Sequence, residues 1–265
     1  MAGDEAAERA ADREWLALKV DERGETATVE LGERHLAPFG RIYGGTGAAL
    51  VSALIEASTG RRLLWATTQF VGACGEGDRL DLKADVVAAG RRTSQVRVTA
   101  HVGDELVLQA LGASGEAGTD IPEGAVAEAP AVPPPADCPE MELAIPDGLP
   151  AGFFGGIERR SVDEGAHRWW MRLPDRPLAR PALLGLAGDC LPPMVMRELG
   201  EPGAGTSLDL TVRVGVPSAA EWLLIDGRPD MAAGGYGHGR VRLWAEDGAL
   251  VGTVAQTTAL WRALG

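Results

Sequence analysis

The sequence predicts an α+β fold made of two similar halves, each with one long helix wrapped by an antiparallel β-sheet. Its 265 residues suit two domains of average size. One helical pattern followed by four strand-like patterns occurs twice along the chain, which is the mark of an internal repeat. A proline-rich stretch separates the two copies. Each sheet can bury one face on its own helix, so both halves can form a core.

The proline-rich stretch sets the expected domain boundaries. It contains AVAEAPAVPPPADCPEMELAIPDGLPAG, and proline at this density removes backbone donors and holds the chain extended. We therefore expect an N-terminal domain over 1–117, a connection over 118–152 and a C-terminal domain over 153–265.

The first half shows one helix among strands. Residues 15–31 turn at ERGE and suggest a strand pair or one strand with a lead-in. Gly44 and Gly45 precede TGAALVSALIEAST, whose apolar residues have helical spacing, with Thr46 as a possible cap and Gly60 as a possible end. Four strand-like runs follow, at 63–71, 79–90, 93–102 and 105–114.

The second half repeats this order. A hairpin is expected from GIERRSV and HRWWMRL, and the apolar run 182–199 has helical spacing that Pro192 and Pro193 must kink or interrupt. The remaining strand-like runs lie at 207–214, 221–230, 235–248 and 249–261. Edge strands of the two halves are expected to pair and extend the sheet.

Composition excludes several classes of function. The net charge of −13 disfavours nucleic-acid binding, which needs clustered basic residues. No run approaches 18 apolar residues, and the acidic N-terminus resembles neither a signal nor a transit peptide, so we expect a cytoplasmic protein that does not enter a membrane. The three cysteines are far apart and form no metal-binding pattern, so neither a metal nor another cofactor is expected.

Both halves resemble a known family. RIYGGTGAALVSAL with the strands that follow it resembles the N-terminal domain of acyl-CoA thioesterase II, and SLDLTVRV, EWLLIDGRPD and DGALVGTVAQTTALWR resemble its C-terminal domain. The resemblance implies a double hotdog fold and hydrolysis of acyl-CoA or a related thioester without a covalent intermediate. It also implies an acyl-CoA-type substrate, and exposed sheet edges make a homo-oligomer plausible.

The family activates a water with an Asp, a Thr and a Gln, and the resemblance assigns these roles to three residues here. Asp209 in SLD matches the Asp, and Gln256 in VAQ matches the Gln. The Thr falls on Asp230, a departure that places a second carboxylate at the site and would raise one pKa. Gly44 and Gly45 either permit a tight turn into the helix or bind the thioester carbonyl through their backbone amides.

The residues themselves suit this assignment. Asp209 lies between Leu208 and Leu210, so it would face a groove if the leucines face the core. Aligning the halves matches Asp209 with Thr67 and Gln256 with Gly112, which predicts one active site per chain.

Other functions stay open. The departure at Asp230 favours a catalytically silent protein that binds acyl-CoA or another hydrophobic ligand. A hydratase is weaker, because the helix after Gly45 carries Glu56 and no His. A serine α/β-hydrolase is disfavoured by the lack of a GxSxG motif.

Overall fold

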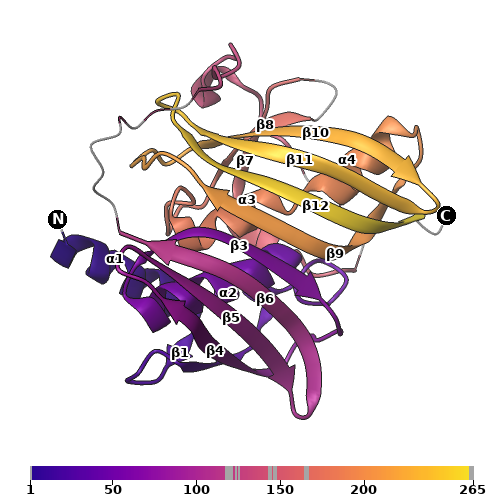
Figure 1. The fold of residues 1–265 in the computed structure, drawn as a ribbon. Coiled ribbons are helices and arrows are strands. Elements are labelled where there is room, and N and C mark those ends of the chain that lie inside the picture. Colours follow the sequence, from indigo (N-terminus) through magenta and orange to yellow (C-terminus); the bar gives the residue numbers. More distant parts are fainter. Residues whose placement is uncertain are drawn as a thin grey trace.

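Two half-chains share one continuous sheet in the structure, a computed structural model (Figure 1). It describes residues 2–116, 122, 124, 126–142, 145, 148–163 and 167–262. The first half, drawn from indigo to magenta, and the second, drawn from orange to yellow, lie side by side with helices of both halves behind the sheet.

The first half contains helices α1 (Ala2–Trp15) and α2 (Gly44–Thr59) and a 3-10 helix (Glu33–His35). Its strands are β1 (Lys19–Val20), β2 (Thr26–Glu30), β3 (Arg62–Phe70), β4 (Arg79–Ala89), β5 (Thr93–Val102) and β6 (Glu105–Gly115). The strand pair and the four long strands predicted from alternation are all present.

The second half contains helices α3 (Leu184–Gly188) and α4 (Leu191–Glu198). Its strands are β7 (Glu158–Ser161), β8 (Arg168–Arg172), β9 (Gly203–Val214), β10 (Leu223–Ala233), β11 (Tyr236–Ala245) and β12 (Leu250–Arg262). Further 3-10 helices lie at Pro135–Asp137, Gly152–Gly156 and Pro181–Leu183.

The strands of the described residues form one sheet in the order β1-β2-β4-β5-β6-β3-β9-β12-β11-β10-β8-β7. The halves join where β3 pairs antiparallel with β9, with Thr67 opposite Thr211 and their hydroxyls 2.9 Å apart. The expected pairing of edge strands is therefore confirmed, and the fold is the predicted double hotdog. This seam places the second-half helices next to α2.

Helix α2 is buried along most of its length because it lies between the sheet and the second half. Residues 45–56 are all buried, which explains why its apolar residues are not confined to one stripe. Gly60 ends the helix in the left-handed conformation, with φ of 67°, as predicted. Thr46 does not cap it, because the helix begins two residues earlier and Tyr43 takes the cap position.

The apolar run of the second half is interrupted before its prolines rather than at them. Helix α3 ends at Gly188, and α4 begins at Leu191 with Pro192 in its first turn. Proline fits there because the first-turn amides have no partner within the helix. The chain is left non-helical at Asp189, with φ of −84° and ψ of 68°.

Residues 126–138 of the predicted connection 118–152 pack on the sheet face opposite the helices. The indole of Trp170 donates a hydrogen bond to the carbonyl of Pro133 over 2.9 Å. Cys138, Trp170, Leu224 and Trp244 form a second apolar cluster under this segment. Of the connection, residues 118–121, 123, 125, 143, 144, 146 and 147 lie outside the described residues.

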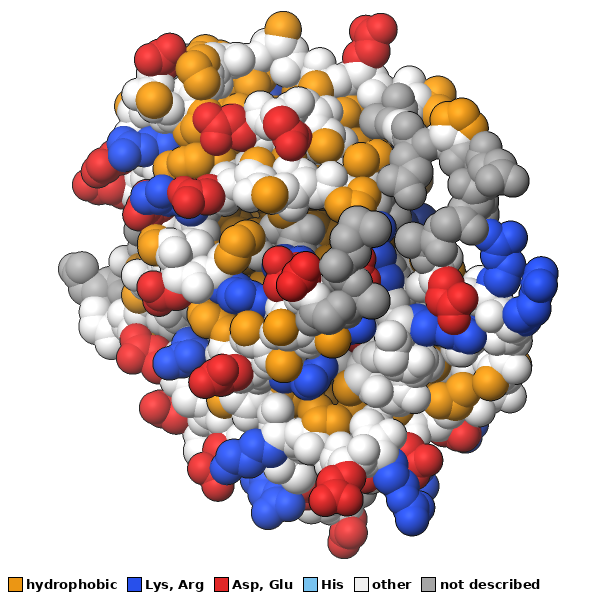
Figure 2. Space-filling model, turned by 90° about the vertical axis from the view of Figure 1, so that its left-hand side faces the viewer, with side chains coloured by type: hydrophobic (Ala, Val, Ile, Leu, Met, Phe, Trp, Pro, Cys, Tyr) orange, Lys and Arg blue, Asp and Glu red, His pale blue; other side chains and the backbone are white. Residues whose placement is uncertain are grey.

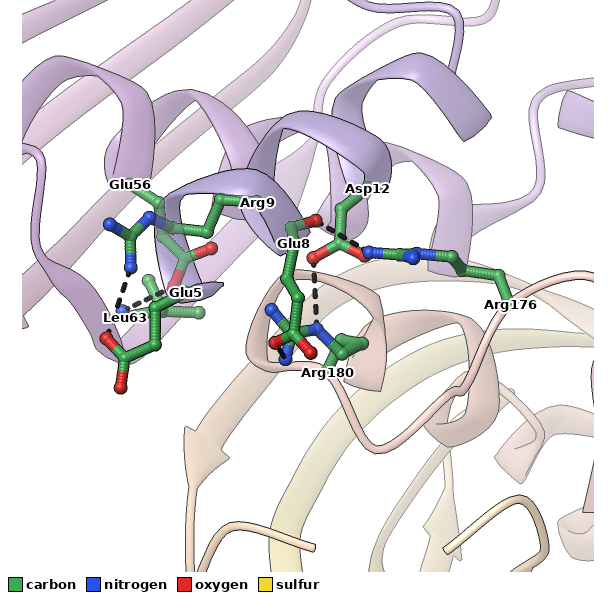
Figure 3. A network of polar contacts seen from close by, with 8 residues as sticks. All are labelled: Glu5, Glu8, Arg9, Asp12, Glu56, Leu63, Arg176 and Arg180. Atoms are coloured by element: carbon green, nitrogen blue, oxygen red, sulfur yellow. Dashed lines mark hydrogen bonds and ion pairs between the residues drawn. The ribbon is translucent and has the colours of Figure 1, made fainter. Parts of the chain in front are cut away.

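Helix α1, which the sequence analysis did not predict, ties the two halves together (Figure 3). Asp12 is 1% exposed and accepts hydrogen bonds from Arg176 over 2.7 Å and from Arg180 over 3.4 Å. Arg180 also pairs with Glu8. Both arginines precede the 3-10 helix that leads into α3, so α1 anchors the segment that carries Asp189.

Charged side chains of both signs are interspersed over the molecular face drawn in Figure 2. This arrangement agrees with a solvated surface. Among the described helices, none combines the length and the hydropathy that crossing a membrane would require.

Candidate active site

A β-bulge shapes the centre of the second half. Gln256 of β12 lies opposite Leu210, and Thr257 lies opposite Asp209, but Thr258 lies opposite Ser207 and leaves Leu208 unmatched. One extra residue reverses the face to which the following side chains point. Ser207 therefore shares the inner, helix-facing side with Gln256, although strict alternation would place it on the outer side with Asp209.

Three polar side chains meet on this inner side, directly in front of the break between α3 and α4. The amide of Gln256 donates short hydrogen bonds to Asp189 Oδ1 and, over 2.7 Å, to Ser207 Oγ. The Ser207 hydroxyl donates to the same carboxylate oxygen over 3.1 Å. Asp189 and Gln256 are 6% and 4% exposed, so the cluster is nearly enclosed.

The N-terminus of α2, from the first half, completes the cluster. The Gly45 amide donates to Asp189 Oδ2 over 2.8 Å. A Cβ at Gly44 would lie 2.6 Å from the same oxygen, so this close approach requires glycine. The partial positive charge of a helix N-terminus favours an anion at this position.

Tyr43 holds the backbone that carries the carboxylate. Its hydroxyl lies 2.6 Å from the carbonyl oxygen of Asp189 and 3.0 Å from that of Leu186. Its ring stacks on Phe153 with centroids 5.0 Å apart. Burial raises the pKa of Tyr43 well above its ordinary value, so the hydroxyl remains a donor.

Opposing effects act on the acidity of Asp189. Burial is the largest and raises the pKa of its carboxyl group, while hydrogen bonds from Gln256, Gly45, Ser207 and Gly44 act in the opposite direction. A carboxylate with a raised pKa is a stronger base than an exposed one. The arrangement can therefore hold a water and accept a proton from it.

One polar atom of the cluster has no partner. Gln256 Oε1 is buried and accepts no hydrogen bond, because its amide nitrogen is turned towards Asp189 and Ser207. A buried acceptor without a partner is uncommon and is costly unless water or ligand satisfies it. An attacking water between this oxygen and Asp189 would satisfy it.

The structure does not bring the three predicted site residues together. Asp209 points to the outer side of the sheet, where its Oδ1 accepts the Thr257 amide over 3.0 Å, whereas Gln256 points inward. The condition that both neighbouring leucines face the core is not met at the bulge, since Leu210 is buried and Leu208 is 38% exposed. Asp209 therefore does not share a groove with Gln256.

Asp230 lies elsewhere on the second half. It is half-exposed, 3.5 Å from Arg240, and lines a charged cavity of about 520 Å³ with Arg168 and Asp226. Neither Asp189 nor Gln256 lines this cavity. A second bulge, between Pro229 and Met231, sets Asp230 at the uncovered edge of β10 and away from the cluster.

The predicted glycines do lie at the cluster, in a different arrangement from the one expected. The amide of Gly45 is bonded to the Asp189 carboxylate rather than free for a thioester carbonyl. The predicted match between the halves also shifts. Gly112 lies opposite Ala66, and Gln256 lies opposite Leu210, so Ala66 is the equivalent of Leu210 and Thr67 is not the equivalent of Asp209.

Asp189 and Ser207 were missed by the sequence analysis. Asp189 is the one charged residue between Pro181 and Pro193 in an otherwise apolar run, and the prolines that follow it signal a break in the helix. Ser207 stands in the same SLD triplet as Asp209, and only the bulge distinguishes them. No three His, Cys, Asp or Glu side chains gather as a metal site within the described ranges.

Both halves match one family of proteins. Residues 34–115 match the acyl-CoA thioesterase N-terminal domain, and residues 128–260 match the acyl-CoA thioesterase C-terminal domain. No functionally curated protein matches the sequence.

Solved structures agree with this match. A putative thioesterase from Novosphingobium aromaticivorans is 30% identical, with a TM-score of 0.84 over 92% of this chain and 98% of its own. A hot dog fold protein of unknown function from Alicyclobacillus acidocaldarius is 23% identical, with a TM-score of 0.80 over 96% and 99%. An acyl-CoA thioesterase II from Mycobacterium marinum is 18% identical, with a TM-score of 0.72 over 96% and 98%, and shows the shared fold.

Proposed function

Because the chain belongs to the acyl-CoA thioesterase family, we propose that it hydrolyses an acyl-CoA or related thioester at the cluster of Asp189, Ser207 and Gln256. The observation that carries this proposal is the buried Asp189 carboxylate, which is held by three donors from both halves.

Each residue has a role that follows from its contacts. Asp189 and the free oxygen of Gln256 accept the two protons of a water and so orient it. Asp189 takes one proton as the water oxygen bonds to the thioester carbonyl carbon. The C–S bond then breaks, the proton passes to the leaving thiolate, and the products are an acid and a thiol.

The remaining groups stabilise the negative charge of the Asp189 carboxylate and of the oxyanion that forms at the thioester carbonyl. Ser207 donates to the carboxylate and keeps Gln256 in place. The N-terminus of α2, with Gly44 and Gly45, faces the reacting centre, and its partial charge would stabilise the oxyanion as well as Asp189. The nucleophile in this scheme is the water, so no covalent acyl-enzyme forms, and the Ser207 hydroxyl serves as a hydrogen-bond donor to the Asp189 carboxylate.

A catalytically silent binding protein is the second candidate, and the structure removes its main support. That candidate rested on a carboxylate, Asp230, in place of a hydroxyl. In the cluster a hydroxyl is present, that of Ser207, and Asp230 lies at another edge of the sheet. We therefore favour hydrolysis.

The test is thiol release from acyl-CoAs of graded chain length by wild type and by Asp189→Asn. Loss of a general base predicts a kcat lower by roughly 10²–10⁴-fold, with acyl-CoA binding retained. Asp85→Asn, a change of the same kind on the outer side of β4, is the matched control and should keep full activity. A folded wild type that binds these thioesters and hydrolyses none would contradict the proposal and favour the binding protein.

A further inference from the structure

Asp209 contacts the backbone of β12 directly beside Gln256, one of the two inward-facing site residues on β9 and β12. Its carboxylate accepts the amide proton of Thr257, the residue directly after Gln256. Asp209 itself is two residues after Ser207, on the other strand of the same bulge. At the bulge this hydrogen bond adds to the backbone ladder that pairs the strand of Gln256 with the strand of Ser207.

We propose that Asp209 is a positioning residue, whose carboxylate holds β9 and β12 together at the bulge so that Ser207 and Gln256 face Asp189. This inference rests on the proposed function. A bulge leaves one residue unpaired and locally disrupts the ladder. The Asp209 side chain supplies an acceptor to the partner strand at that place.

On the outer side of the sheet, Thr257 also contacts β11, the strand that pairs with the other edge of β12. Thr257 Oγ1 lies 3.1 Å from His238 Nδ1 of β11. Thr257 is thus held through its amide by β9 and through its hydroxyl by β11. These contacts hold the backbone next to Gln256 from the outer side of the sheet.

The first half offers a natural comparison. Its strand β3 has the same bulge, with Leu63 opposite Ser114 and Trp65 opposite Ala113, so Trp65 occupies the place of Asp209. The bulge therefore forms without a carboxylate. In that half the inward positions carry Leu63 and Gly112, which have no polar group to aim. The carboxylate is present in the half that has a polar cluster to orient.

Two substitutions at Asp209 distinguish a residue that only accepts a hydrogen bond from one that acts as a catalytic base. An asparagine at this position keeps a side-chain oxygen of the same reach but cannot take a proton, whereas alanine removes the acceptor. A positioning residue should tolerate the first change and fail with the second. A base should fail with both.

The experiment compares Asp209→Asn and Asp209→Ala with wild type in the thiol-release assay, using the acyl-CoA that wild type hydrolyses fastest. We expect Asp209→Ala to lower kcat by about 10–100-fold with KM within about threefold, since small displacements of positioned groups cost this much. Asp209→Asn should stay within about threefold of wild type and keep its pH profile. Asp85→Ala is the matched control on the same side of the sheet and should remain fully active.

A second measurement does not depend on activity. Hydrogen exchange of the Thr257 amide should be faster in Asp209→Ala than in wild type and close to wild type in Asp209→Asn. If wild type hydrolyses no thioester, the proposed function fails, while this exchange result still decides whether Asp209 holds the strand. If Asp209→Ala does not fold, Asp209→Ser, whose side chain is too short to reach the amide, replaces it.

Two results would overturn the inference. Equal loss of kcat in Asp209→Asn and Asp209→Ala would mean that the charge, rather than the acceptor, is required. Full activity and unchanged exchange in Asp209→Ala would mean that the contact does not position the site.

Discussion

Glu56 should make the stability of this protein depend on pH. The side chain lies in α2, is 2% exposed and accepts the Leu63 amide over 2.9 Å (Figure 3). Burial is the main cause that raises the pKa of its carboxyl group to about 7, against an ordinary value of 4.5. In the folded protein this carboxyl therefore keeps its proton to a higher pH than in the unfolded chain.

The sign of the effect follows from proton binding. Between pH 4.5 and 7 the folded state binds more protons at Glu56 than the unfolded state, so the free energy of unfolding falls as pH rises. The stabilising contribution is complete below this window and is lost above it. A shift of this size corresponds to at most about 3.5 kcal/mol, at about 1.4 kcal/mol for each pH unit.

Glu56→Gln removes the titration and keeps an oxygen that can accept the Leu63 amide. We expect the variant to be more stable than wild type by about 1–3 kcal/mol at pH 8.5 and by much less at pH 5.5, as measured by urea unfolding. Glu105→Gln, at the exposed start of β6, is the control and should show no such change with pH. A stability difference that is the same at both pH values would refute the reasoning.

Two further changes test the contacts that join the halves. Asp12→Ala leaves two largely buried arginines without their shared carboxylate and should lower the free energy of unfolding by about 2–4 kcal/mol in urea; a loss below about 0.5 kcal/mol would show that α1 is not anchored there. Gly44→Ala sets a methyl group against the Asp189 carboxylate and should lower kcat at least tenfold, whereas Gly32→Ala meets no atom within 4 Å and should not; equal activities would contradict the close approach.

Regular strands were predictable because one face of each is buried. The runs at 79–90 and 93–102 alternate as β4 and β5 do, since every second side chain lies in the core. Helix α1 was not predicted, because its acidic sequence was considered only as a targeting signal. Its place is set by distant residues, Arg176 and Arg180, whose proximity no local pattern reveals.

The site was only partly predictable, because no local sequence pattern reveals which distant residues meet there. Gln256 followed from the resemblance, and it does lie in the polar cluster. The partners of Gln256 depend on where a strand departs from regularity. Alternation places Ser207 and Asp209 on one face, and the single unmatched residue at Leu208 separates them. A bulge has no firm sequence signal, so Asp209 was taken for the residue that faces the groove.

The geometry of the cluster also explains why a duplicated fold carries one polar site. Asp189 belongs to the second half, but its carboxylate is held by the helix N-terminus of the first half. The reciprocal site would need a carboxylate at the start of α2, where neither glycine has room for a side chain: a Cβ at Gly44 would meet the Asp189 carboxylate, and one at Gly45 would meet Tyr43 and the Gly185 backbone. Building the first site therefore removes the second. The first half has correspondingly apolar or absent side chains at Leu63 and Gly112, and it contributes the helix terminus rather than the chemistry.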